Sequence, residues 1–60
     1  MSPMLNNNPA QIQLFVWSVS RRSWQFDCEA DNYEEYRSLL AVKRHYEREG
    51  KLVKIVGELK

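Results

Sequence analysis

The sequence has few of the residues on which catalytic and metal sites depend. Its 60 residues include one cysteine, Cys28, one histidine, His45, and two glycines. A lone cysteine excludes an intramolecular disulfide, and one cysteine with one histidine cannot supply the four ligands of a structural zinc site. Two glycines cannot form a glycine-rich phosphate loop, and no side chain forms a nucleophile with a neighbouring base. We therefore expect a protein that is not an enzyme and needs no metal or cofactor.

Long hydrophobic runs are also missing. The longest, Leu14–Trp17 and Leu39–Val42, have four residues each, whereas a membrane-spanning helix needs about 20. Met1–Ala10 contains no Lys or Arg and no apolar core, so it does not resemble a signal peptide. Nine basic residues oppose eight acidic ones for a net charge of +1, which predicts no long-range field that would attract nucleic acid or a membrane. These features favour a cytoplasmic protein without a membrane partner.

The length is enough for one small domain. Asn6–Pro9 is a turn-forming cluster with nothing apolar to bury. We therefore expect residues 1–10 to be a flexible tail and residues 11–60 to form a single α+β domain.

The segment Ile12–Val19 is apolar on both faces, which is typical of a central strand. Alternation places Ile12, Leu14 and Val16 on one face and Gln13, Phe15, Trp17 and Val19 on the other. A polar hairpin loop, Ser20–Ser23, leads to a second strand, Trp24–Glu29. There the same alternation predicts that one face carries Trp24, Phe26 and Cys28 and that the other, facing water, carries Gln25, Asp27 and Glu29.

A helix is predicted from Tyr33 to about Glu49, with Asp31 and Asn32 as alternative caps at its start and Gly50 ending it. Lys43 and Glu47 are one turn apart and are expected to pair. The apolar stripe that should pack on the sheet consists of Tyr33, Tyr36, Leu39, Leu40, Val42 and Tyr46.

The last predicted strand is Lys51–Leu59, with Val53, Ile55, Gly57 and Leu59 facing the helix. Placing the most apolar strand in the centre gives a three-stranded antiparallel sheet of order 2-1-3 in a β-β-α-β chain. One helix covers only one face. The opposite face is then an expected partner-binding surface, formed by Phe15, Trp17, Val19, Leu52, Lys54 and Val56.

Several readings of that surface remain open. The N-terminal tail could fold over it, a second copy could cover it in a homodimer, or a larger protein could bind it. Arginines are candidate auxiliary contacts for phosphate or an acidic partner, and an ordinary solvated surface is the alternative for them: Arg21, Arg22, Arg37, Arg44 and Arg48. An acidic stretch could meet a basic groove or imitate nucleic-acid phosphates, and helix capping is the alternative explanation for up to four of its residues: Asp27, Glu29, Asp31, Glu34 and Glu35.

The order of motifs resembles the small bacteriophage inhibitors of bacterial RNA polymerase. The similar stretches, within residues 12–56, are Leu14-Phe15-Val16-Trp17, Trp24-Gln25-Phe26, Ala30-Asp31-Asn32-Tyr33-Glu34-Glu35 and Gly50-Lys51-Leu52-Val53-Lys54-Ile55-Val56. The resemblance implies an inhibitor that binds a bacterial machine in the host cytoplasm, with RNA polymerase as the first target and a CRISPR or other defence complex as the second. In that family arginines on the last strand help to bind the polymerase, whereas this chain offers Lys54 there. A small nucleic-acid-binding protein that uses the aromatic face is the remaining alternative.

Overall fold

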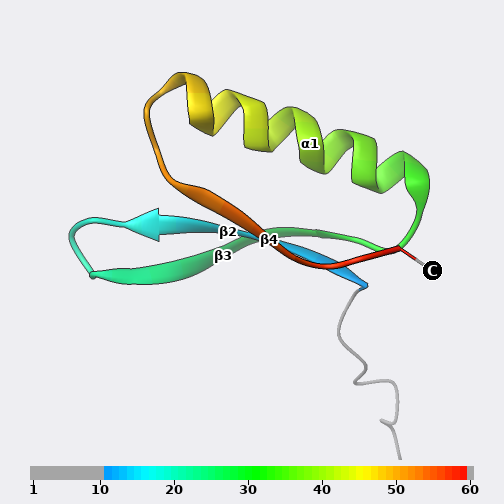
Figure 1. Cartoon of the computed structure of the whole chain (residues 1–60), viewed down its shortest axis with the longest axis horizontal. Coiled ribbons are helices and arrows are strands. Elements are labelled where there is room, and N and C mark those ends of the chain that lie inside the picture. Colours follow the sequence, from blue (N-terminus) through cyan, green and yellow to red (C-terminus); the bar gives the residue numbers. More distant parts are fainter. Residues whose placement is uncertain (1–10, 60) are drawn as a thin grey trace, which may run out of the picture.

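The computed structural model describes residues 11–59, which form one sheet with one helix above it (Figure 1). The elements are β2 (Ile12–Ser18), β3 (Ser23–Ala30), α1 (Tyr33–Arg48) and β4 (Val53–Gly57). β2 lies between β3 and β4 and pairs antiparallel with both. The predicted α+β fold, chain order and strand order are confirmed. The predicted flexible tail, residues 1–10, lies outside the described residues.

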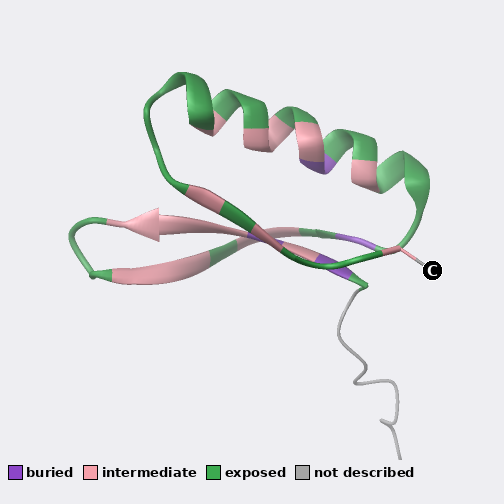
Figure 2. Cartoon of the chain, viewed as in Figure 1, coloured by how far each residue is buried: buried purple, intermediate pink, exposed green. Residues whose placement is uncertain are grey.

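The core lies between α1 and the face of the sheet that α1 covers (Figure 2). Four of the side chains in residues 11–59 are buried: Ile12, Leu14, Ala30 and Leu39. Partly buried residues from β3, α1, β4 and the segment after β4 pack around them: Cys28, Tyr36, Val42, Val53, Ile55 and Leu59. A core this small fits a chain of this length, because a short domain removes only about 60% of its unfolded surface from water.

Both ends of α1 are closed by specific hydrogen bonds. Asn32 is the N-cap, and its side-chain oxygen accepts from the backbone N–H of Glu35 at 2.9 Å. The Glu35 carboxylate in turn accepts from the N–H of Asp31 at 2.8 Å. Between the two predicted caps the structure therefore selects Asn32, while the Asp31 carboxylate accepts from the N–H of Gln11 at 2.9 Å.

The C-terminal end of α1 is a Schellman motif. Gly50 has a φ of +81°, its N–H donates to the Glu47 carbonyl, and the Lys51 N–H donates to the Tyr46 carbonyl, both at 3.0 Å. The Lys51 ammonium lies 5.6 Å from the centre of the Tyr46 ring, where this motif usually has a hydrophobic contact. The predicted end of the helix at Gly50 is thus explained by its left-handed backbone.

A β-bulge in β3 overturns the predicted facing of the second strand. Leu14 pairs with Cys28, but the next residue of β2, Phe15, pairs with Phe26, so Asp27 has no partner. An extra residue shifts the alternation by one position. Trp24 and Phe26 therefore lie on the face opposite the helix, although Cys28 faces the helix as predicted. Asp27, expected to face water, points toward the helix and accepts a hydrogen bond from Tyr46.

The hairpin and the helix start also differ from the prediction. β2 ends at Ser18 and β3 begins at Ser23, so the loop is Val19–Arg22, one residue earlier than expected. The Ser18 hydroxyl accepts from the Arg21 N–H at 3.2 Å, and Arg22 adopts a positive φ of 53°, which lets a four-residue loop close. Tyr33, predicted in the buried stripe, is 67% exposed, because the first turn of α1 overhangs the end of the sheet (Figure 1).

Substitution of the two glycines should lower stability by different amounts. At Gly57, φ is +94° and an added Cβ would lie 2.0 Å from the Gln11 carbonyl oxygen, whereas at Gly50 an added Cβ meets nothing within 4 Å. Gly50→Ala should lower the free energy of unfolding by about 1 kcal/mol through backbone strain alone. Gly57→Ala should lower it by roughly 2 to 3 kcal/mol, because β4 must also move away from Gln11. Urea unfolding of both variants measures this, and equal losses would contradict the packing at Gly57.

Candidate functional site: an aromatic sheet face

The face of the sheet opposite α1 carries three rows of side chains across β3, β2 and β4. The pairing places Glu29, Gln13 and Val56 in one row and Phe26, Phe15 and Lys54 in the next. The third row, nearest the hairpin, holds Trp24 and Trp17. The Trp17 N–H donates to the Leu52 carbonyl at 2.9 Å, which extends this row to Leu52. No element among residues 11–59 covers this face (Figure 1).

Four aromatic rings on this face form two pairs between β2 and β3. The Phe15 and Phe26 ring centres are 5.9 Å apart at an interplanar angle of 75°. The Trp17 and Trp24 ring centres are 5.4 Å apart at 72°. Both are edge-to-face arrangements, which match the positive edge of one ring to the negative face of the other. We call the four residues Phe15, Trp17, Trp24 and Phe26 the aromatic face.

Lys54 completes the aromatic face from β4. Its ammonium lies 4.6 Å from the centre of the Trp24 ring and 5.9 Å from that of Phe15. Since Lys54 pairs with Phe15 on the intervening strand, its side chain reaches across β2 toward β3. Both distances lie within the range of cation–π attraction, so the positive charge lies beside the rings while the side chain stays exposed to solvent.

The other predicted contact residues have mixed outcomes. Leu52 and Val56 flank Lys54 on the same face and are 64% and 46% exposed. Val19 does not belong to this face, because the strand ends at Ser18 and Val19 is 81% exposed in the hairpin loop. The predicted placement of Val19 on this face was therefore wrong, because β2 ends one residue earlier than expected.

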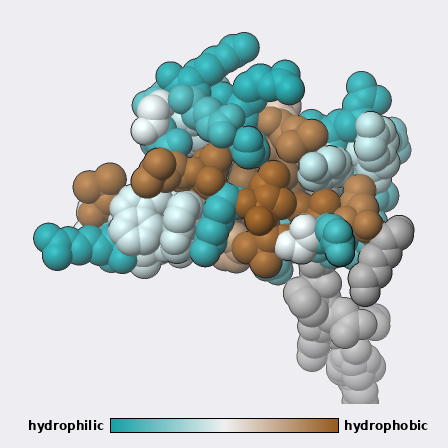
Figure 3. Space-filling view, viewed as in Figure 1, coloured by the Kyte–Doolittle hydropathy of each residue, from teal (hydrophilic) through white to brown (hydrophobic). Residues whose placement is uncertain are grey.

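The predicted arginines fall into two groups that the structure keeps apart. Arg21 and Arg22 are exposed at the hairpin, beyond the Trp17 and Trp24 row. Arg37, Arg44 and Arg48 are exposed on α1, which packs on the other side of the sheet. Hydrophilic side chains cover much of the outer surface of the helix, and at the hairpin tip they lie beside a hydrophobic group (Figure 3). Only Arg21 and Arg22 therefore lie beside the aromatic face.

Trp24 and Phe26 are the site residues that the sequence prediction missed. Strict alternation from Cys28 assigns both to the helix side, and no glycine or proline in Trp24–Ala30 signals a bulge. The spacing of the aromatic residues agrees with the observed register, because that register pairs Phe with Phe and Trp with Trp. Aromatic cross-strand pairs stabilise a sheet.

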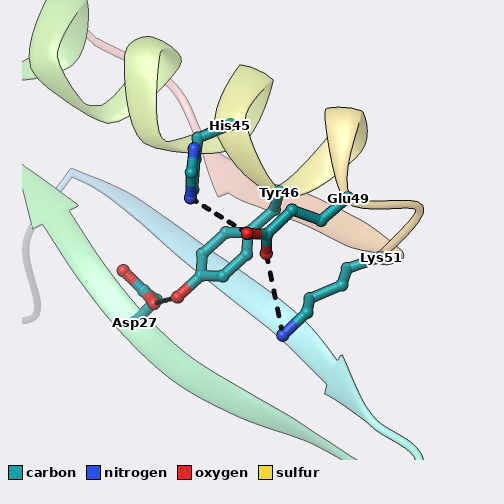
Figure 4. Close-up of polar contacts among 5 residues, drawn as sticks. All are labelled: Asp27, His45, Tyr46, Glu49 and Lys51. Carbon is teal, nitrogen blue, oxygen red and sulfur yellow. Dashed lines mark hydrogen bonds and ion pairs between the residues drawn. The ribbon is translucent and has the colours of Figure 1, made fainter.

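On the helix side, a polar cluster surrounds Tyr46 (Figure 4). The Tyr46 hydroxyl donates to the Asp27 carboxylate at 2.5 Å and so anchors the bulge to α1. The Glu49 carboxylate lies 3.3 Å from the His45 Nε2 and 3.9 Å from the Lys51 ammonium. The hydrogen bond to the Asp27 carboxylate, with smaller effects of burial, raises the pKa of Tyr46 above its usual value.

The single cysteine lies in a setting that suppresses thiol reactivity. Cys28 lines a shallow hollow between α1 and β3, together with Glu29, Glu35, Ser38, Leu39 and Val42. Burial raises the pKa of the Cys28 thiol, and the negative charge of Asp27 raises it further. Reactive cysteines have a lowered pKa and an electropositive setting, and Cys28 has the opposite.

Among residues 11–59, no three His, Cys, Asp or Glu side chains are grouped so that they could hold a metal ion. The helix in this part of the chain is too short and too polar to cross a membrane. Comparison of the chain with protein families, with curated proteins and with solved structures finds no match.

The Tyr46–Asp27 contact predicts how stability depends on pH. Because the neutral phenol donates to the carboxylate, the folded protein holds the Tyr46 proton more tightly than the unfolded chain does. This contribution is complete below the unfolded pKa of about 10 and is lost as the pH rises through the raised folded value. Tyr46→Phe should lower the free energy of unfolding by about 1 kcal/mol at neutral pH and remove this part of the alkaline destabilisation. Urea unfolding at neutral and alkaline pH measures both, and an unchanged alkaline loss in Tyr46→Phe would contradict the assignment.

Proposed function

We propose that this chain is a small non-enzymatic protein-binding module and that its aromatic face is the contact surface. The observation that carries the proposal is the placement of four aromatic rings side by side on the sheet face that α1 does not cover. Phe26 is 53% exposed and the adjacent Leu52 and Val56 are also exposed. Uncovered apolar patches of this kind mark interaction sites, and aromatic residues dominate the binding energy of protein interfaces.

The geometry of the rings favours a protein over a nucleic acid. Bases bind aromatic platforms by stacking on free ring faces. Here Lys54 lies over Trp24 and Phe15, and each edge-to-face pair directs the edge of one ring at the face of the other. A protein side chain needs no parallel ring face, because apolar contact with ring edges is also favourable.

The finer identity of the partner rests on the sequence resemblance alone. The motifs within residues 12–56 resemble bacteriophage inhibitors of bacterial RNA polymerase, and the β-β-α-β fold keeps these motifs in one unit. We therefore propose an inhibitor that acts in the bacterial cytoplasm. RNA polymerase is the first target to test, and a CRISPR or other defence complex is the second.

A nucleic-acid-binding protein remains the second candidate function. It is favoured by one observation: Lys54 and the hairpin residues Arg21 and Arg22 lie on both sides of the Trp17 and Trp24 row. Basic groups beside aromatic residues are the pattern of single-strand binding surfaces. Salt-sensitive binding to single-stranded oligonucleotides at low ionic strength would support this candidate.

Phe26→Ser should weaken partner binding more than it lowers stability. Because Phe26 is 53% exposed, its removal should cost the folded protein about 1 kcal/mol through loss of the ring pair with Phe15, whereas loss of an interface anchor costs about 2 kcal/mol, or roughly thirtyfold in affinity. Tyr33→Ser is the matched control, since Tyr33 is an exposed aromatic residue on α1. The measurements are the affinity for purified RNA polymerase and capture from a bacterial lysate, with wild type and both variants side by side.

Equal binding by wild type and Phe26→Ser, with both proteins folded, would show that the aromatic face is not the contact surface. Loss of binding in Tyr33→Ser alone would place the contact on α1. Sedimentation distinguishes self-association: a dimer that Phe26→Ser dissociates would identify the face as a homodimer interface instead.

A further inference from the structure

Most charged side chains of the described chain are sorted along its long axis, and the exceptions are Arg37 near the start of α1 and Asp27 within β3. Acidic residues gather at the end of the sheet where the helix begins: Glu29, Asp31, Glu34, Glu35 and Glu58. Basic residues gather at the hairpin and at the helix end beside it: Arg21, Arg22, Lys43, Arg44, Arg48, Lys51 and Lys54. In Figure 1 the hairpin and the end of α1 lie at the same side of the molecule. A net charge near zero therefore conceals a strong separation of charge.

The carboxylates at the basic end are already paired with nearby basic residues. The two carboxylates at the hairpin end of α1 are already engaged, Glu47 with Lys43 at 3.0 Å and Glu49 with His45 and Lys51. Within residues 11–59, Arg21, Arg22 and Lys54 form no ion pair. These three positive charges are therefore free to meet an external carboxylate.

The free positive charges adjoin one half of the aromatic face. Lys54 lies against the Trp24 ring, and Arg21 and Arg22 follow the strand end at Ser18, one residue beyond Trp17. Adjacent rows on a sheet face are about 7 Å apart, which is within the Debye length of about 8 Å at physiological salt. An anionic group over the two tryptophans would thus lie within reach of the Lys54 charge, on the side of the face that leads into the two hairpin arginines. Glu29, in the row beyond Phe26, gives the opposite end of the same face a negative charge.

We propose that the partner presents an acidic segment to this face, with its carboxylates over the tryptophan half and apolar, uncharged or basic side chains toward Glu29. This inference rests on the proposed function. The charge pattern of the face distinguishes a peptide from a nucleic acid. A single strand carries a phosphate at every nucleotide, so a strand lying along the face would bring phosphates to Glu29. A peptide places acidic residues only where Lys54, Arg21 and Arg22 lie.

The protein carries its own reporter for this test. Its two tryptophans, Trp17 and Trp24, both belong to the aromatic face, so their fluorescence responds directly to a ligand bound there. The probes are three ligands without tryptophan or tyrosine: a short peptide with a block of leucines and a block of glutamates, the same peptide with lysines in place of the glutamates, and an oligothymidylate of similar length.

The glutamate peptide should change the tryptophan fluorescence at lower concentration than either other ligand, and added salt should weaken its binding. Reversing charge at the hairpin with Arg21→Glu and Arg22→Glu together should reduce its affinity about tenfold. Arg37→Glu is the control, because Arg37 is exposed on α1 and not on the sheet. The control should leave the affinity unchanged.

Three outcomes would overturn the inference: tighter binding of oligothymidylate, equal binding of the lysine peptide, or no response to any ligand at millimolar concentration. Its failure is distinguishable from failure of the proposed function. If Phe26→Ser abolishes binding to the protein partner while the hairpin charge reversal does not weaken it, the face is the contact surface but the partner segment is not acidic. If Phe26→Ser has no effect on that binding, the proposed function itself fails.

Discussion

The hydrogen bond between Asp27 and Tyr46 fixes the β-bulge in β3, and the side chains on both faces of the sheet depend on that bulge. Asp27 is the extra residue of β3, and its carboxylate is tied to α1 by the Tyr46 hydroxyl. This contact lets Cys28 and Ala30 pack under the helix while Phe26 and Trp24 emerge on the other side. Without the bulge, Trp24 and Phe26 would face the helix side, and the aromatic face would consist of Phe15 and Trp17 alone.

The bulge also affects how the exposed edge of β3 can pair with other chains. A bulge twists an edge strand and interrupts its regular row of unpaired N–H and C=O groups, which discourages pairing with other chains. β3 is such an edge, and its charged residues Asp27 and Glu29 add to the effect. The chain therefore exposes aromatic side chains on a sheet whose bulged edge is a poor template for aggregation. Binding through side chains on the face is compatible with that protection.

Sequence reasoning predicted the fold well because the strongest signals were local or unambiguous. Asn32 and Gly50 bracket a helix that begins and ends where capping chemistry places it, and Ile12–Ser18 is the segment most suited to a central strand. The predicted pair Lys43–Glu47 forms at 3.0 Å because helical spacing fixes it. Each of these features is determined by residues within a few positions of one another.

The candidate site was only half predicted, for an equally physical reason. Phe15 and Trp17 follow from alternation along a regular strand, whereas Trp24 and Phe26 depend on one unpaired residue whose partner, Tyr46, is 19 positions away. The end of a strand is similarly set by tertiary closure, so Val19 was assigned to the sheet but lies in the loop. Tyr33 has helical spacing to the core residues, but the sheet does not extend beneath the first turn of α1.

The pairing of Ile12 with Gly57 has a consequence for protein engineering. Because these residues are neighbours on antiparallel strands, the described chain enters and leaves the fold at one place, at the end of the sheet away from the hairpin (Figure 1). Adjacent termini are the geometry in which a domain is tolerated as an insertion within the surface loop of another protein. Such a chimaera would present the hairpin and its tryptophans at the point farthest from the host scaffold.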